Sequence, residues 1–427
     1  MKTLFHADIL TKDFSVLKGG YLGVNGDKIA YVGQDKPEGY GTCRELAGHL
    51  LIPGLYNMHT HTPMVLMRGL GSDLPLHRWL EEVIFPIEAH LTPDDIGVGT
   101  RLAMMELLAG GVVSFTDMYD MQAISAKEIE TAGMKANLSR PVLAFDKSEP
   151  YEKNFRKDEA LSFYDNCHGM ADGRIKVDFA IHGEYTSYDE VVRKHGEDCQ
   201  KRGAIMHLHL SETAKEHEEC KERHGKTPAK YFSDLGVFDN PTVAAHCVMV
   251  EPEDIEIMLE KGVTAVHNPS SNMKLGSGFM PIREMLSKGI GIALGTDGAA
   301  SNNNLNLFEE LHLASVIHKG YEKNPTIVHP AALLYMATQA GAKAQGRPDC
   351  GALEAGKKAD IAAINLNRAH LMPVHDMPSL LVYSAQASDV AMTMVDGKIL
   401  FENGNYTTID VEKARFDLEK SIARLFR

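Results

Sequence analysis

Two histidines, His59 and His61, stand one residue apart at the end of the apolar run LLIPGLYNMHTH. On a β-strand, alternate side chains face the same side, so both imidazoles would point toward one place. Neutral imidazole nitrogens are common ligands of divalent metal ions. A lone His-x-His pair also occurs by chance on surface loops. The pair therefore indicates a metal site only if further ligands follow along the chain.

Further polar groups of this kind occur at the ends of four later apolar runs. These runs carry HLHLSE with His207, His209 and Glu212, AHC with His246, HNP with His267, and GTDG with Asp297. A single buried histidine is more often a packed, hydrogen-bonded residue than a ligand. The occurrence of such residues at several strand ends argues against that interpretation. Histidine and aspartate without thiolate favour Zn²⁺ or Fe²⁺ with one position left for water, which is typical of a catalytic metal.

Short apolar runs alternate with amphipathic helical patterns from about residue 50 to about residue 345. Eight strands are predicted, with the sequences LLIPGLYNMH, VVSFTDM, MKANLSRPV, IKVDFAIH, AIMHLHL, TVAAHCV, TAVHNP and IGIALGTD. The clearest helix has Thr92 as N-cap, Pro93 in the first turn, and Gly110 at its end. Repeated strand and helix units predict a (β/α)₈ TIM-like barrel, in which functional residues follow the carboxyl ends of the strands.

The two ends of the chain have a different pattern, with short strands and hairpin turns at Asn25-Gly26 and Asp396-Gly397. Such turns join antiparallel strands. We therefore expect a small β-sandwich domain formed by residues 1–50 and 350–427, and a catalytic barrel formed by residues 51–349. This arrangement would bring the two termini close together. A helix is predicted over about residues 411–426.

Composition excludes several classes of function. With 44% hydrophobic and 24% charged residues, the 427-residue chain resembles an ordinary globular protein, and no apolar run reaches membrane-spanning length. The N-terminus does not resemble a secretory signal, so a cytoplasmic location is expected. Six scattered cysteines predict no disulfide framework. A net charge of −14 disfavours nucleic-acid binding but permits a small nucleoside ligand. We expect no nucleic-acid or membrane partner, and a homo-oligomer.

Four motifs, PGLYNMHTH, HLSE, HNPSSNMKLGSG and GTDGAASNNN, together resemble those of the amidohydrolase superfamily. The likeness extends over nearly the whole chain and is strongest to the S-adenosylhomocysteine and 5′-methylthioadenosine deaminases. This resemblance implies a metal-dependent hydrolase of C–N bonds in cyclic amidines. Such an enzyme would remove the 6-amino group of S-adenosylhomocysteine, 5′-methylthioadenosine or adenosine, and would release ammonia and an inosine-type product.

The resemblance also implies roles for individual residues. One divalent metal ion is expected per subunit, Zn²⁺ in the first place and Fe²⁺ as the alternative. Its ligands would be His59, His61, His209 and Asp297. The binuclear relatives use a carboxylated lysine at the end of the fourth strand, where this chain has AIHG around His182. A single metal is therefore expected.

A bound divalent cation can lower the pKa of its water from 15.7 to about 7–9. In the implied reaction, Glu212 takes a proton from this water and delivers it to the purine N1 while the oxygen attacks C6. His246 and Asp297 would hold the attacking oxygen and stabilise the charge that develops. Glu212 follows His209 by three residues, so its carboxylate can reach the site without being a ligand.

Substrate contacts are expected from the long segment 62–91, whose length suggests a lid over the barrel mouth. By resemblance, Glu88 would accept hydrogen bonds from both ribose hydroxyls, and Trp79 would cover an apolar 5′ substituent. The structural alternatives are that Trp79 simply packs and that Glu88 faces solvent.

Three further residues are implied in substrate binding or left open. His182 matches a substrate-contacting position. Arg140, at the end of the third barrel strand, matches a position that pairs with the carboxylate of a homocysteine tail, although a structural salt bridge is a comparable alternative. A second arginine for that tail has no secure counterpart, although Arg156 lies nearby in the sequence.

Two competing hypotheses stay open at this point. The first is an aminohydrolase of another ring, such as guanine, cytosine or a chlorinated triazine, in which Glu88 would not be needed for binding ribose. The second is a metal-containing binding protein without turnover. Glu212 and the complete ligand set count against the second hypothesis.

Overall fold

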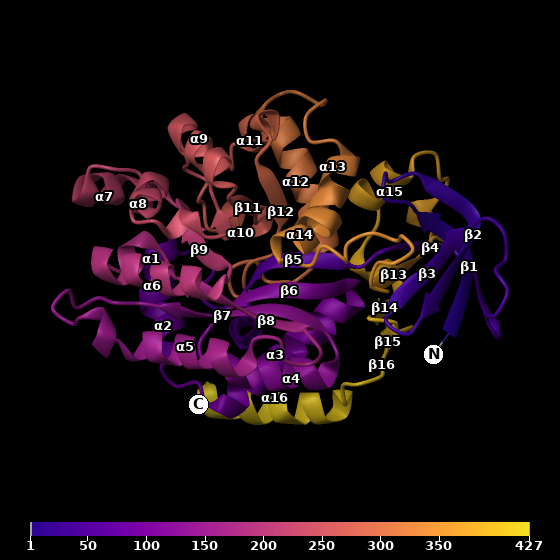
Figure 1. The fold of residues 1–427 in the computed structure, drawn as a ribbon, viewed down its shortest axis with the longest axis horizontal. Helices are drawn as coiled ribbons and strands as arrows, with labels where there is room; N and C mark the ends of the chain where they lie inside the picture. The colour runs from indigo at the N-terminus through magenta and orange to yellow at the C-terminus, as the bar shows by residue number, and fades with distance from the viewer. Residues whose placement is uncertain (1, 427) are drawn as a thin grey trace.

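The computed structural model describes residues 2–426 and contains two eight-stranded sheets (Figure 1). One sheet is parallel, and its strands are adjacent in the order in which they occur along the chain. Its strands are β5 (Leu55–Thr60), β6 (Val112–Met118), β7 (Lys135–Val142), β8 (Ile175–Ile181), β9 (Met206–Leu210), β10 (Thr242–His246), β11 (Thr264–His267) and β12 (Gly291–Leu294). These are the eight predicted strands, and the predicted barrel architecture is confirmed.

The barrel is closed between its last and first strands by hydrogen bonds of the residues that follow β12. The Asn57 amide donates to Thr296 Oγ1 over 2.7 Å, and the Thr296 backbone N–H donates to Asn57 Oδ1 over 3.0 Å. The Asp297 N–H donates to the His59 carbonyl over 2.9 Å. A Cβ on Gly295 would lie 2.9 Å from the backbone nitrogen of His59, so only glycine permits the two segments to approach this closely.

Helices surround the barrel and cover its outer face (Figure 1). They are α3 (Pro93–Ala109), α4 (Gln122–Ala132), α5 (Phe155–Cys167), α6 (Asp189–Arg202), α7 (Ala214–His224), α8 (Pro228–Asp234), α9 (Pro252–Lys261), α10 (Pro269–Lys274), α11 (Ile282–Lys288), α12 (Leu307–Tyr321), α13 (Pro330–Tyr335) and α14 (Gly341–Ala344). α3 begins as predicted, because the Thr92 N–H and hydroxyl both donate to Asp95 Oδ2 and cap its first turn.

The second sheet is assembled from both ends of the chain. Its order is β16-β15-β14-β13-β4-β1-β2-β3, and the antiparallel pairing of β13 with β4 joins the two ends. Its strands are β1 (Lys2–Leu10), β2 (Val16–Asn25), β3 (Lys28–Gly33), β4 (Cys43–Pro53), β13 (Ile361–Asn365), β14 (Val390–Val395), β15 (Lys398–Glu402) and β16 (Asn405–Tyr406). Phe5, Leu22, Ile361 and Met394 share one apolar core. A small β-sandwich formed by both termini was expected, and the structure has a second sheet to which both termini contribute.

The predicted strand LLIPGLYNMH is divided at Gly54. Residues up to Pro53 complete β4 of the terminal sheet, whereas β5 of the barrel begins at Leu55. A side chain on Gly54 would overlap Val113 of β6, so the chain can pass between the two sheets only with glycine here. The apolar pattern continues across the break because both strands are buried, which is why it predicts one strand.

The C-terminal helix α16 (Val411–Leu425) leaves the terminal sheet and packs against α3. Arg101 Nη1 donates to Asp417 over 2.8 Å, and Arg424 pairs with Asp95. This helix carries the C-terminal end along the barrel, far from the N-terminal strand (Figure 1). The expectation that the termini lie close together was therefore wrong. None of the helices in residues 2–426 is both long and apolar enough to cross a membrane.

A buried ion pair joins the base of the barrel to the terminal sheet. Lys135, the first residue of β7, has only 2% of its side chain exposed. Its ammonium donates to Asp360 Oδ1 over 2.5 Å and to Asp396 Oδ1 over 2.7 Å. Tyr56 also donates to Asp360, over 3.3 Å. Two carboxylates thus share one buried cation.

We expect Lys135→Met to lower the free energy of unfolding by roughly 3–5 kcal/mol, because it leaves Asp360 charged and buried without its partner. Urea denaturation monitored by circular dichroism measures this loss. Lys261→Met is the matched control, since the Lys261 side chain is 32% exposed and pairs with Asp239, outside this cluster, over 2.8 Å. A control change of about 0–1 kcal/mol is expected. Equal losses in the two variants would contradict the assigned role of Lys135.

Candidate active site

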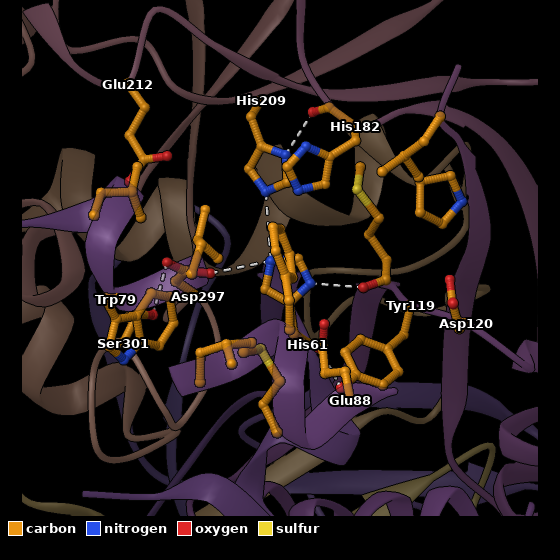
Figure 2. Close-up of a pocket in the computed structure, with 18 of the residues that line it drawn as sticks. His61, Trp79, Glu88, Tyr119, Asp120, His182, His209, Glu212, Asp297 and Ser301 are labelled. Carbon is orange, nitrogen blue, oxygen red and sulfur yellow. Dashed lines mark hydrogen bonds and ion pairs between the residues drawn. The ribbon is translucent and has the colours of Figure 1, made fainter. Parts of the chain in front are cut away.

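The predicted functional residues come together at the carboxyl ends of the barrel strands. His59 lies near the end of β5, His61 follows it, His209 lies on β9, His246 ends β10, and Asp297 follows β12. All except the deeper His59 line a cavity of about 400 Å³. Figure 2 shows His61, His209 and Asp297 pointing toward one another at the bottom of this cavity.

The ligating atoms of these residues converge. His61 Nε2 lies 3.2 Å from Asp297 Oδ1 and 3.4 Å from His209 Nε2. His59 Nε2 lies 3.4 Å from the same Asp297 oxygen, and it is buried without a hydrogen-bond partner. A buried imidazole nitrogen without a partner is costly, and a cation at this point would satisfy it. The donor set therefore fits one divalent metal ion.

Hydrogen bonds on the outer side of the ligands aim them at this point. His61 Nδ1 donates to the Met118 carbonyl, and His209 Nδ1 donates to the His182 carbonyl, each over 2.6 Å. In the neutral form of each ring, Nε2 then keeps its lone pair for the site. Burial also lowers the pKa of His209 well below 6.5 and that of His59 to about 3, so both rings are neutral.

Asp297 faces the site with Oδ1, which also accepts a hydrogen bond from the Gly298 N–H over 2.7 Å. Its Oδ2 accepts hydrogen bonds from Ser271 Oγ over 2.6 Å and from Ser301 Oγ over 2.8 Å. Burial opposes ionisation, but the close contacts with His59 and His61 outweigh it and hold the pKa of Asp297 well below its usual value. Asp297 is therefore an anion facing the imidazole nitrogens. Burial lowers the pKa of His61, but the interaction with Asp297 outweighs it and raises that pKa to about 9.

Glu212 and His246 form a second pair beside the ligands. His246 Nδ1 donates to Asn272 Oδ1 over 2.8 Å, and its Nε2 lies 3.9 Å from Glu212 Oε2. The Glu212 backbone N–H donates to Glu216 Oε2 over 2.7 Å, which fixes the turn carrying Glu212. Burial raises the pKa of the Glu212 carboxyl. Sequence reasoning missed Asn272 and Glu216, although both lie in or beside the motifs that it used.

The segment 62–91 forms one wall of the cavity. It contains a 3₁₀ helix (Thr62–Met67), α1 (Leu76–Trp79), a π-helical turn (Leu80–Ile84) and α2 (Phe85–Glu88). Trp79 lines the cavity, and its indole N–H donates to the Leu70 carbonyl over 3.2 Å. Glu88 also lines the cavity and accepts a 2.5 Å hydrogen bond from Tyr119. Burial raises the pKa of Glu88 to about 7.

The two arginines considered for the substrate tail differ in their position relative to the cavity. The Arg140 guanidinium donates to Asp120 over 2.5 Å and to Glu159 over 2.9 Å, and it is absent from the cavity wall. Its neighbour Pro141 lines the cavity, so the alternation of β7 turns Arg140 to the other side. Arg156 does line the cavity, and it lies 3.6 Å from Asp120.

His182 lies in the cavity wall, as expected for a substrate-contacting residue. Its ring centroid lies 4.8 Å from that of His209. Its Nδ1 is buried and has no hydrogen-bond partner. This nitrogen is available to a ligand.

Known proteins resemble the chain over nearly its whole length. The Amidohydrolase family matches residues 50–400. A 5-methylthioadenosine/S-adenosylhomocysteine deaminase of Thermoanaerobacter pseudethanolicus is 42% identical over 95% of this chain and 94% of its own. A 5′-deoxyadenosine deaminase of Methanosarcina acetivorans is 41% identical over 98% of both chains.

Solved structures agree with this fold. The crystal structure of an adenosine deaminase from Xanthomonas campestris with bound zinc superimposes with a TM-score of 0.93. It is 29% identical, and the match covers 99% of this chain and 98% of that one. Together with the family match, these similarities show that the chain belongs to the amidohydrolase family.

We expect Asp297→Asn to weaken zinc binding strongly, because it removes the only anion from the donor set. Loss of a residue that merely hydrogen-bonds a metal ligand typically weakens binding by roughly 10–100-fold, and the expected loss here is larger. Metal content after dialysis, measured by plasma mass spectrometry, tests this. Asp178→Asn is the matched control, because Asp178 is also a buried carboxylate but bonds Asn137. Equal zinc retention by the two variants would count against the assigned ligand.

Proposed function

We propose that the protein is a metal-dependent hydrolytic deaminase of adenine nucleosides, with S-adenosylhomocysteine, 5′-methylthioadenosine and adenosine as candidate substrates. The observation that carries this proposal is the pair formed by Glu212 and His246, whose Oε2 and Nε2 atoms lie 3.9 Å apart. Both residues line the same cavity as the proposed ligands His61, His209 and Asp297. A carboxylate able to carry protons beside a metal site is the requirement for hydrolytic removal of an amino group.

The proposed ligands are His59, His61, His209 and Asp297, with Zn²⁺ as the expected ion and Fe²⁺ as the alternative. When bound, such an ion supplies a water of lowered pKa that can act as a nucleophile near neutral pH. The crystallised Xanthomonas relative with bound zinc supports this choice.

Protein groups carry out the proton transfers of the proposed reaction. Burial raises the pKa of Glu212 and so favours its protonated form, which can deliver a proton to N1 of the purine. His246, whose Nδ1 donates to Asn272, would hydrogen-bond the attacking water through Nε2, and Asp297 would help to hold the same water. Glu212 would then carry the second proton of this water to the amino group, so that the C6–N bond breaks and ammonia leaves while the new C6–O bond remains.

The nucleoside is proposed to bind along the lid segment. Glu88 faces the cavity rather than solvent, and Tyr119 occupies one of its oxygens, so the other can accept hydrogen bonds from ribose hydroxyls. Trp79 offers an apolar ring in the same wall, and His182 offers its free Nδ1. A ribose-binding carboxylate favours nucleosides over the free guanine, cytosine or triazine rings.

The substrate tail is proposed to meet Arg156. This side chain lines the cavity and has only a 3.6 Å contact with Asp120, whereas Arg140 is occupied by Asp120 and Glu159. A homocysteine tail carries both a carboxylate and an ammonium group, which match Arg156 and Asp120 in charge. This proposal takes Arg156 rather than Arg140 as the residue that contacts the tail, and it gives Arg140 the structural salt bridges that the sequence left open as the alternative.

We expect Glu212→Gln to lower kcat for ammonia release by about 10²–10⁴-fold, because the amide cannot carry the proton, while the zinc content stays unchanged. The assay couples ammonia release from adenosine, 5′-methylthioadenosine and S-adenosylhomocysteine to glutamate dehydrogenase. Glu222→Gln, at an exposed position, is the control and should keep wild-type rates.

Free guanine, cytosine and a chlorinated triazine belong in the same assay. Wild-type protein loaded with metal that releases ammonia only from these rings, or from none of the adenine nucleosides, would overturn the proposed function.

We expect Arg156→Gln to lower kcat/KM for S-adenosylhomocysteine by roughly 10- to 100-fold and to leave 5′-methylthioadenosine nearly unchanged, because only the first substrate has a carboxylate. Steady-state kinetics with both substrates gives the ratio. Arg193→Gln, which removes an exposed arginine of α6, is the control. An equal loss for both substrates would show that Arg156 does not contact the tail.

A further inference from the structure

Two His-x-His motifs face each other across the barrel. His59 and His61 belong to the first barrel strand and the residue after it, and His207 and His209 belong to β9, the fifth barrel strand. The outer members, His61 and His209, present their Nε2 atoms to the site 3.4 Å apart. The inner members contact each other directly, with His59 Nδ1 2.9 Å from His207 Nε2. Three of the four histidines are thus proposed ligands, and His207 has no assigned role.

The ligands are aimed in two different ways. His61 and His209 donate to backbone carbonyls, which a side-chain substitution does not remove. His59 Nδ1 instead contacts only the side chain of His207. Both rings are completely buried, so water cannot replace this contact.

The donor and acceptor of the His59–His207 hydrogen bond follow from the hydrogen bonds that His207 makes on its other side. Ser139 Oγ donates to the Asp117 carbonyl over 3.1 Å, and a carbonyl can only accept. The Ser139 oxygen is then the acceptor for His207 Nδ1–H at 3.5 Å. In a neutral ring the other nitrogen, Nε2, must accept, so His59 Nδ1 is the donor. The His59 lone pair is consequently on Nε2, which faces Asp297 at 3.4 Å.

We propose that His207 is a positioning residue that holds His59 in the tautomer and orientation needed to bind the metal. Its partner Ser139 sets the direction of the chain of hydrogen bonds from the Asp117 carbonyl to His59. The inference rests on the metal site proposed above. It adds a residue one layer deeper in the barrel, which does not touch substrate or metal.

Zinc affinity measured by competition with a chromogenic chelator tests the role of His207. We expect His207→Leu to weaken zinc binding by about 10–100-fold, because Nδ1 of His59 loses its acceptor. His207→Gln, whose amide oxygen can accept the same hydrogen bond, should restore affinity to within a few-fold of wild type. His195→Leu is the matched control, since His195 is another completely buried histidine, on α6.

Two further measurements separate positioning from general packing. The visible absorption spectrum of the Co²⁺-substituted protein should change in His207→Leu and stay unchanged in His195→Leu. Only the first substitution removes a residue that orients a metal ligand, His59. Ser139→Ala leaves a small cavity and should weaken zinc binding several-fold, which tests the relay even if His207→Leu does not fold.

Unchanged affinity in both His207→Leu and Ser139→Ala would overturn the inference and leave the proposed function intact, provided that wild type binds zinc and releases ammonia. A loss in His207→Gln as large as that in His207→Leu would also overturn it, because the acceptor would then not matter. Wild-type protein that binds no zinc would overturn both proposals.

Discussion

Closure of the barrel between its first and last strands is the constraint on which the site depends. The reciprocal hydrogen bonds of Asn57 and Thr296, and the bond from Asp297 N–H to the His59 carbonyl, hold two chain segments together that are about 240 residues apart. They set the carboxylate of Asp297 against the imidazoles of His59, near the end of β5, and His61, just after it. Without this closure the acidic ligand and the histidines would belong to opposite edges of an open sheet.

The second organising feature is the layered use of polar groups inside the barrel. At the mouth, the nitrogens of His61 and His209 face the cavity, whereas one layer below, His59 and His207 hydrogen-bond each other. Ser139 and the Asp117 carbonyl continue this chain of hydrogen bonds. Burial lowers the pKa values of His59, His207 and His209, and in a neutral ring each hydrogen bond fixes which nitrogen keeps a lone pair. The geometry of the ligands is therefore determined well below the atoms that would bind a metal.

Much of the fold followed from simple patterns, and the failures have physical explanations. Apolar runs identified all eight barrel strands because parallel strands are buried on both faces. The same continuous burial concealed the break at Gly54, where the chain passes from one sheet to the other. Continuous burial also concealed the direction in which the Arg140 side chain points, since an apolar strand buried on both faces does not show which residues point into the barrel. Only the neighbouring Pro141 in the cavity wall reveals it.

The sequence by itself determined the chemistry of the site: histidines and an aspartate without thiolates, each placed at a strand end, and a glutamate three residues after one of them. These are local properties, because strand periodicity and residue type act over a few positions. The tertiary structure alone decided which groups meet, including Tyr119 with Glu88, Asn272 with His246, and His207 with His59. Such contacts depend on strand phase and barrel closure, which are set by packing between residues far apart in the chain.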